Sequence, residues 1–236
     1  MSSSIRIGNT ELVDLLLSLI ALTVGFAILG AMRVPSTEIL FISAIGTGTG
    51  FLLHELAHKF VAQRYGYWAE YRANRLGLIL IVVMAFLGFI FAAPGAVMIY
   101  KAHPRPEDAY WAGLSPESSG STGSSGSSGW SGLPGSPGQS ETERKEELWI
   151  SLAGPLTNIA LVILFFALIM SGAITSRLWF SAANFALFIN LTLAAFNLLP
   201  FGPLDGAKVW RSSHIIWAVV AVPTILIAVP VYLGMI

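Results

Sequence analysis

The chain of 236 residues has no cysteine and very little charge. The lack of cysteine excludes disulfide scaffolds, thiol nucleophiles and cysteine-ligated metal sites, so any metal must bind to His, Asp or Glu. Only 11% of the residues are charged, whereas an average globular protein has about 25%. The 13 basic and 13 acidic residues cancel, which argues against a strongly basic nucleic-acid binder. We therefore expect no nucleic-acid partner.

The sequence is instead rich in long apolar runs. Hydrophobic residues make up 55% of the sequence, and the mean hydropathy is +0.72. A hydrocarbon core of about 30 Å requires about 20 mostly apolar residues in a helix. The runs with at most one charged residue are 12–32, 39–53, 76–100, 148–176, 178–204 and 212–236. We predict an all-α, multi-pass integral membrane protein with about six transmembrane helices, located in the cell membrane and in contact with the lipid bilayer.

These runs divide the chain into five segments. Residues 101–147 form a Gly/Ser-rich linker with charged flanks, in which glycine recurs at every third position from 120 to 138. Collagen would need more proline, so a flexible linker, natural or engineered, is the better interpretation. The remaining segments are 1–38 with the first span, 39–100 with the second and third, 148–211 with the core helices, and 212–236 with the last span.

The informative residues are the ionisable ones within this apolar pattern. His54, Glu55 and His58 directly follow the run 39–53, and a charged group costs about 2.5–3.5 kcal/mol at the centre of a membrane helix. His54 and His58 project from one helix face, one turn apart, so both imidazoles can bind one ion. Glu55 lies about 100° around the helix, where it can act as a base on a metal-bound water. The alternative is that both histidines are interfacial residues at a helix end.

A catalytic zinc usually has three protein ligands and one open position. Asp205 is the leading candidate for the third ligand, because it ends the uncharged run 178–204. Pro200 and Pro203 break the helix before it, which favours an unwound turn that lines a cavity. His214 is the competing candidate, but a histidine at the start of the last run is commonly interfacial.

Three sequence blocks together suggest a family. They are HELAH at 54–58, SLAGPLTN at 151–158 and NLLPFGPLDG at 197–206. In this order they resemble the site-2 protease family of intramembrane zinc metalloproteases, peptidase family M50. The resemblance covers about 39–208 apart from the linker. It implies Zn²⁺ held by His54, His58 and Asp205, with Glu55 as the general base.

The resemblance also bears on two asparagines. It implies that Asn197 is catalytic and assists at the reacting carbonyl, where an amide N–H can stabilise the developing oxyanion. The alternative is that Asn197 only caps the turn before Pro200. For Asn158 we expect a structural role, in which its side chain bonds the backbone freed by Pro155.

The implied reaction is hydrolysis of peptide bonds in transmembrane segments of other membrane proteins, known as regulated intramembrane proteolysis. A peptide bond in a regular helix is shielded, so the substrate helix must unwind locally and can then pair with an exposed strand edge.

Gly46 and Gly50 equally fit a polar cavity and close helix packing. A divalent-metal transporter that uses the same His and Asp side chains, and a non-catalytic family member, are the alternatives. The chain departs from the family pattern at one point: relatives with a short intervening region have a re-entrant hairpin where this chain has the long apolar run 76–97.

Overall fold

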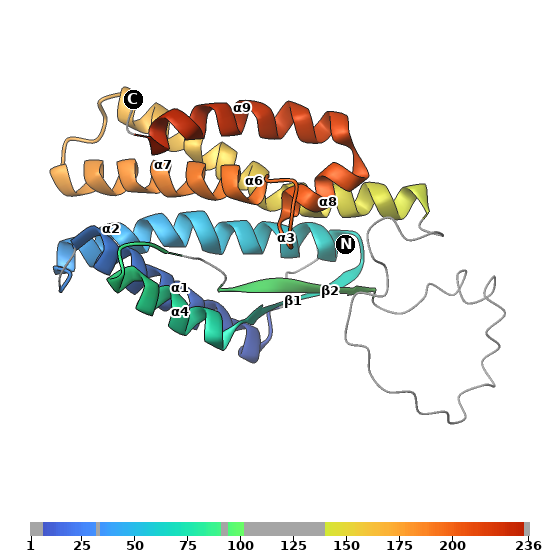
Figure 1. Cartoon of the computed structure of the whole chain (residues 1–236), viewed down its shortest axis with the longest axis horizontal. Coiled ribbons are helices and arrows are strands. Elements are labelled where there is room, and N and C mark those ends of the chain that lie inside the picture. The colour runs from blue at the N-terminus through green and yellow to red at the C-terminus, as the bar shows by residue number, and fades with distance from the viewer. Residues whose placement is uncertain (1–6, 32–33, 91–93, 102–139, 234–236) are drawn as a thin grey trace.

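The computed structural model describes residues 7–31, 34–90, 94–101 and 140–233, and it is mostly helical (Figure 1). Of the linker predicted at 101–147, residues 102–139 lie outside the described residues, and residues from Glu141 onward belong to the helix Glu141–Met170. The elements in chain order are α1 (Asn9–Ala31), α2 (Thr37–Thr47), the π-helical turn η1 (Gly48–Leu52), α3 (Leu53–Arg64), β1 (Tyr67–Ala73), α4 (Arg75–Phe86), β2 (Gly95–Lys101), α6 (Glu141–Met170), α7 (Arg177–Asn197), α8 (Asp205–Ser212) and α9 (His214–Tyr232).

Five helices in the described part of the chain are long and apolar enough to cross a membrane. They are Asn9–Ala31, Thr37–Arg64, Glu141–Met170, Arg177–Asn197 and His214–Val231. The second of these joins α2, η1 and α3 into one helix of 28 residues. The prediction of a helical, multi-pass membrane protein is therefore confirmed.

The third predicted span, at 76–100, has a different structure. The helix α4 has only 12 residues, about 18 Å at 1.5 Å per residue, and is too short to cross the hydrocarbon core. Gly88, with φ of 88°, follows its end. The chain then returns as β2, which pairs antiparallel with β1. The whole stretch is apolar, and an apolar run without a clear period does not distinguish a long helix from a short helix followed by a strand.

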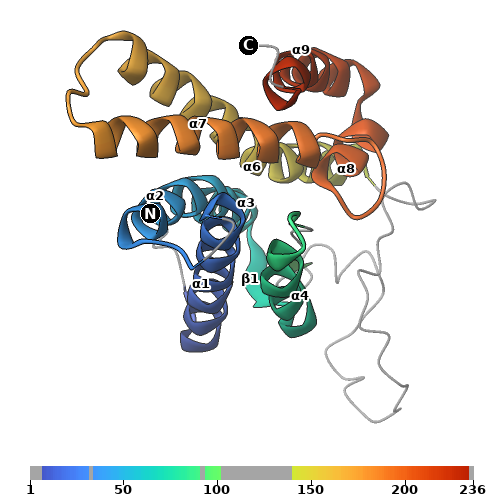
Figure 2. The same cartoon turned by 60° about the vertical axis from the view of Figure 1, so that its left-hand side comes forward.

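The helix that carries the HELAH block lies in the middle layer of the molecule. Figures 1 and 2 show α2 and α3 between two groups of elements. On one side lie α1, α4 and the two-stranded sheet, and on the other lie α6, α7 and α9. The helix α3 packs against α6 on one side and β1 on the other. Residues of α3 are therefore screened by protein on two sides.

A buried ion pair connects α3 to the first group. Glu11 of α1 and Lys59 of α3 are each 1% exposed, and the lysine Nζ donates to the Glu11 carboxylate. The same carboxylate accepts the backbone N–H of Tyr71 at 3.1 Å, and Asp14 accepts that of Ala73 at 3.2 Å. The carboxylates of α1 thus occupy N–H groups on the outer edge of β1.

The side chain of Tyr71 adds a second connection to α1. Burial raises the pKa of its hydroxyl, so the group stays protonated. It donates a hydrogen bond to Ser18 Oγ at 2.9 Å. The sheet is therefore held to α1 by both its backbone and a side chain.

We predict that breaking the Glu11–Lys59 pair destabilises the protein strongly. Glu11→Gln or Lys59→Met alone leaves the other group buried without its partner, which costs about 3–5 kcal/mol. Each single variant should lower the unfolding temperature of the purified protein in detergent. The double variant should lose less than the sum of the single losses, because neither charge is then stranded.

The exposed pair Glu141–Lys145, with 2.8 Å between its charged atoms, provides the control. Lys145→Ala should leave the unfolding temperature unchanged, since solvent screens such a pair. Strictly additive losses at Glu11 and Lys59 would contradict the expected coupling.

Candidate metal centre

The helix that carries the HELAH block is irregular just before the block. The π-helical turn η1 separates α2 from α3, and such turns are frequent at functional sites. A Cβ at Gly46 would lie 2.5 Å from the Phe185 ring, and one at Gly50 would lie 2.8 Å from Ile189. Of the two interpretations of these glycines, the structure therefore shows close packing of this helix against α7.

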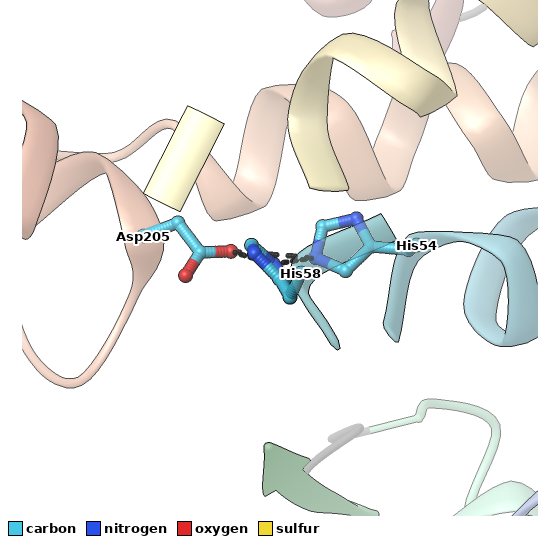
Figure 3. A group of neighbouring side chains, drawn as sticks. All are labelled: His54, His58 and Asp205. Carbon is cyan, nitrogen blue, oxygen red and sulfur yellow. Dashed lines mark hydrogen bonds and ion pairs between the residues drawn. The ribbon is translucent and has the colours of Figure 1, made fainter. Parts of the chain in front are cut away.

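His54, His58 and Asp205 converge on one point (Figure 3). Asp205 Oδ2 lies 3.3 Å from His54 Nε2 and 3.0 Å from His58 Nε2, and the two Nε2 atoms are 3.0 Å apart. All three residues are buried. Two imidazoles and one carboxylate are a donor set that suits a catalytic zinc with an open fourth position. The structure thus brings together the three residues predicted as ligands.

The predicted competitor His214 does not join this group. It is exposed at the start of α9, and its ring contacts the ring of Trp210 with centroids 4.3 Å apart. Among the described residues, the group with metal-ligand geometry contains only His54, His58 and Asp205.

A backbone carbonyl fixes the orientation of one imidazole. His58 Nδ1 lies 2.7 Å from the carbonyl oxygen of Ile150 in α6. A carbonyl can only accept, so Nδ1 carries the proton and Nε2 keeps its lone pair for a metal. This is the tautomer that a zinc ligand requires.

The turn that carries Asp205 is held in place by its neighbours. It runs from the end of α7 to the start of α8, and Gly202 adopts a φ of 66° within it. The indole of Trp217 in α9 donates to the carbonyl oxygen of Leu198 at 2.8 Å. Gly206 packs against the backbone of Leu198 so closely that a Cβ there would overlap it. The unwound turn predicted around the two prolines is therefore fixed at both of its ends.

Glu55 and Asn197, the two predicted catalytic residues, occupy different positions. Glu55 is half-buried on α3, within electrostatic range of both histidines and Asp205. Asn197 is the last residue of α7 and is half-buried. Among the described residues its side chain has no hydrogen-bond partner. The structure therefore gives no capping hydrogen bond for the alternative role of Asn197. Its role at the reacting carbonyl stays a prediction.

Sequence reasoning does not assign three further groups at the site. The Ile150 carbonyl leaves no sequence signal, because every residue has one. Lys208 Nζ lies 3.5 Å from Asp205 Oδ1, and its i+3 spacing on one helix could have indicated this contact. Gly154 stands within the SLAGPLTN block, where only the family resemblance draws attention to it.

Gly154 allows α6 to pass directly over the two imidazoles. A Cβ at this position would overlap His58 Nε2 and would lie 2.5 Å from His54 Nε2. Any larger residue must therefore move the helix or the ligands.

We predict that Gly154→Ala lowers the zinc content of the purified protein and abolishes hydrolysis. The added methyl group displaces the two Nε2 atoms from their common point. Metal analysis and a cleavage assay check this, with Gly48→Ala as the control because a Cβ at Gly48 meets nothing within 4 Å. Full zinc occupancy in Gly154→Ala would contradict the expected clash.

Comparisons with known proteins agree with the geometry of this site. The family model of peptidase family M50 matches residues 41–183 and 169–226. The protein named "Putative zinc metalloprotease MJ0611" from Methanocaldococcus jannaschii is 37% identical over 226 residues, which cover 94% of this chain and 95% of that protein. "Putative zinc metalloprotease Rip3" from Mycobacterium tuberculosis is 40% identical over 65 residues, 27% of this chain and 16% of that protein.

No solved structure matches the chain. The family model nevertheless covers more than half of the sequence, and the archaeal relative is similar over nearly its whole length. Their shared zinc-protease character agrees with the buried group of two histidines and one aspartate. The chain belongs to peptidase family M50 and is a zinc metalloprotease.

Proposed function

We propose that this metalloprotease hydrolyses peptide bonds within transmembrane segments of other membrane proteins in the cell membrane. The observation that carries the proposal is the position of the site. His54 and His58 are buried in Thr37–Arg64, a helix long and apolar enough to cross a membrane. A peptide bond that is cleaved here must therefore reach a site that lies within this long apolar helix.

Each residue of the site has a separate role in the proposed hydrolysis. A zinc ion held by the three ligands supplies a Lewis acid that acidifies water and polarises a carbonyl. Glu55 accepts the proton of the attacking water and passes it to the leaving nitrogen. The Asn197 amide, at the end of α7, donates to the carbonyl oxygen as negative charge develops on it.

An unwound substrate segment needs partners for its exposed backbone groups. Among the described residues β2 pairs only with β1, which leaves its other edge open. The strand β2 also packs against α3. A substrate strand added to this edge would lie beside the catalytic helix.

The register identifies which groups face the open edge. The N–H groups of Tyr71 and Ala73 bond to α1, so these residues point their backbone groups away from β2. Paired residues in an antiparallel ladder alternate between bonded and non-bonded positions. Tyr71 is opposite Val97, and Ala69 is opposite Ile99. Val97 and Ile99 therefore direct their own N–H and C=O groups to the open edge.

We predict that Glu55→Gln retains zinc but lowers cleavage by about 10²–10⁴-fold or more, since the amide cannot accept the proton. The measurement combines metal analysis with cleavage of a transmembrane substrate reconstituted in liposomes. Glu38→Gln, at an exposed position on α2, should behave as the unchanged protein.

Two outcomes would refute parts of the proposal. Undiminished cleavage by Glu55→Gln would refute the role of Glu55 as the general base. Equal efficiency on a soluble peptide and on the membrane-embedded substrate would refute the intramembrane specificity while leaving the protease assignment intact.

We also predict that Ile99→Pro lowers kcat/KM for the transmembrane substrate by about 2–10-fold. The substitution removes one open-edge N–H, and a backbone hydrogen bond contributes roughly 1 kcal/mol. Proline is tolerated at such an edge position. Ile99→Ala is the matched control, because it also loses the isoleucine packing against the buried cluster of Ala62, Ala69 and Ile150 but keeps the N–H. An equal loss in both variants would show that the edge does not pair with substrate.

A further inference from the structure

Two of the three zinc ligands have a hydrogen-bond partner on the side away from the metal position. His58 Nδ1 bonds the Ile150 carbonyl at 2.7 Å, and Asp205 Oδ1 lies 3.5 Å from Lys208 Nζ. The third ligand differs. His54 Nδ1 is buried and has no hydrogen-bond partner among the described residues. Zinc-bound histidines almost always donate this second N–H, which sets the tautomer and the ring orientation.

Asn158 of α6 is a second buried polar side chain without a hydrogen-bond partner within the described ranges, and its amide can both donate and accept. It is 0% exposed, and neither its Oδ1 nor its Nδ2 has a partner in the described part of the chain. The expected bonds to the backbone freed by Pro155 are therefore absent. A buried amide without partners typically lowers the stability of the fold by about 1–3 kcal/mol. Such a residue therefore needs an explanation other than its contribution to packing.

The packing of α6 against α3 indicates on which side of the two histidines Asn158 is expected. Ile150, Gly154 and Asn158 are spaced by four residues and share one face of α6. Ile150 contacts His58, and Gly154 contacts both histidines, so the contacts move toward the start of α3 as α6 proceeds. By this progression Asn158, one turn further on, is expected beyond Gly154 on the His54 side.

The orientation of the His54 ring agrees with this placement. Side chains in a helix lean toward its N-terminus, so the His54 ring leans toward the residues before it. In Figure 3 the His54 ring nitrogen without a dashed line points toward the α6 ribbon. This nitrogen is Nδ1, because Nε2 makes the contacts with His58 and Asp205.

We propose that Asn158 is a positioning residue for zinc, whose Oδ1 accepts, through one buried water, the hydrogen bond that the Nδ1–H of His54 donates. The bond holds His54 in the tautomer whose Nε2 lone pair faces the metal. The inference rests on the zinc site and not on the proposed transmembrane substrate.

Asn190 of α7 is the competing partner, since its Oδ1 is also buried without a hydrogen bond. Its Nδ2, however, already donates to Ala186 O at 2.8 Å and to Thr49 Oγ1 at 3.2 Å. These two bonds direct the amide to its own helix and to η1. Asn190 therefore serves as a matched comparison in the test.

The test measures the zinc affinity of the purified full-length protein by competition with a chelator. Asn158→Leu, which keeps the volume but removes the acceptor, should weaken zinc binding by about 10–100-fold. Asn158→Asp should bind zinc within a few-fold of the unchanged protein, because a carboxylate accepts the same bond. Asn190→Leu should also stay within a few-fold.

A second readout separates positioning from general packing. Cobalt substituted for zinc should give an altered visible spectrum in Asn158→Leu and an unchanged one in Asn158→Asp, a difference that a purely structural role would not produce. Asn158→Ala replaces Asn158→Leu if the leucine variant does not fold, and the same loss of affinity is expected.

Unchanged zinc affinity in the variants that lack the acceptor would overturn the proposal. An equal loss in Asn190→Leu would also overturn it, by assigning the role to Asn190. Neither result depends on cleavage, so failure of the protein to cut a transmembrane substrate would refute the proposed function and leave this inference standing.

Discussion

The close approach of α6 to α3 at Gly154 is the contact on which the metal centre depends. Two imidazoles one turn apart on α3 define a point in space, and α6 must pass over that point without a side chain in the way. The same crossing brings the Ile150 carbonyl to His58 and places a buried amide one turn beyond Gly154. One helix crossing thus supplies both the space for the ligands and a hydrogen bond that orients one of them.

The third ligand comes from a separate part of the chain and needs its own support. Asp205 begins a short helix after an irregular turn, and that turn would be costly in lipid unless its backbone groups were satisfied within the protein. Trp217 satisfies one of these groups from the last span. On the opposite side of α3, the Glu11–Lys59 pair fixes the helix against α1. The catalytic helix is therefore held from both layers by directional polar contacts, since apolar packing alone is only weakly directional in a membrane.

The ligands were predictable from the sequence because charge is so scarce. In a chain with few ionisable residues, His54, His58 and Asp205 stand out at the ends of uncharged runs, and the helical spacing of the histidines is specific. The run 76–100 was not predictable in the same way, since apolar residues without a period fit a span, a short helix or a strand equally well. The contacts of Gly154 and Ile150 depend on which helices become neighbours, and a single sequence does not contain that information.

The capping of β1 by Glu11 and Asp14 has a consequence for how copies of the protein meet in the bilayer. A two-stranded sheet with two free edges can pair head to tail with the sheets of other copies, and such contacts continue without limit. Because side chains from the same molecule already occupy N–H groups on the β1 edge, β1 cannot offer a full ladder to the β2 edge of a neighbour. Any association through strands is then restricted to β2 against β2, which closes after two copies. The carboxylates of α1 therefore remove one of the two free edges that head-to-tail pairing of sheets would need.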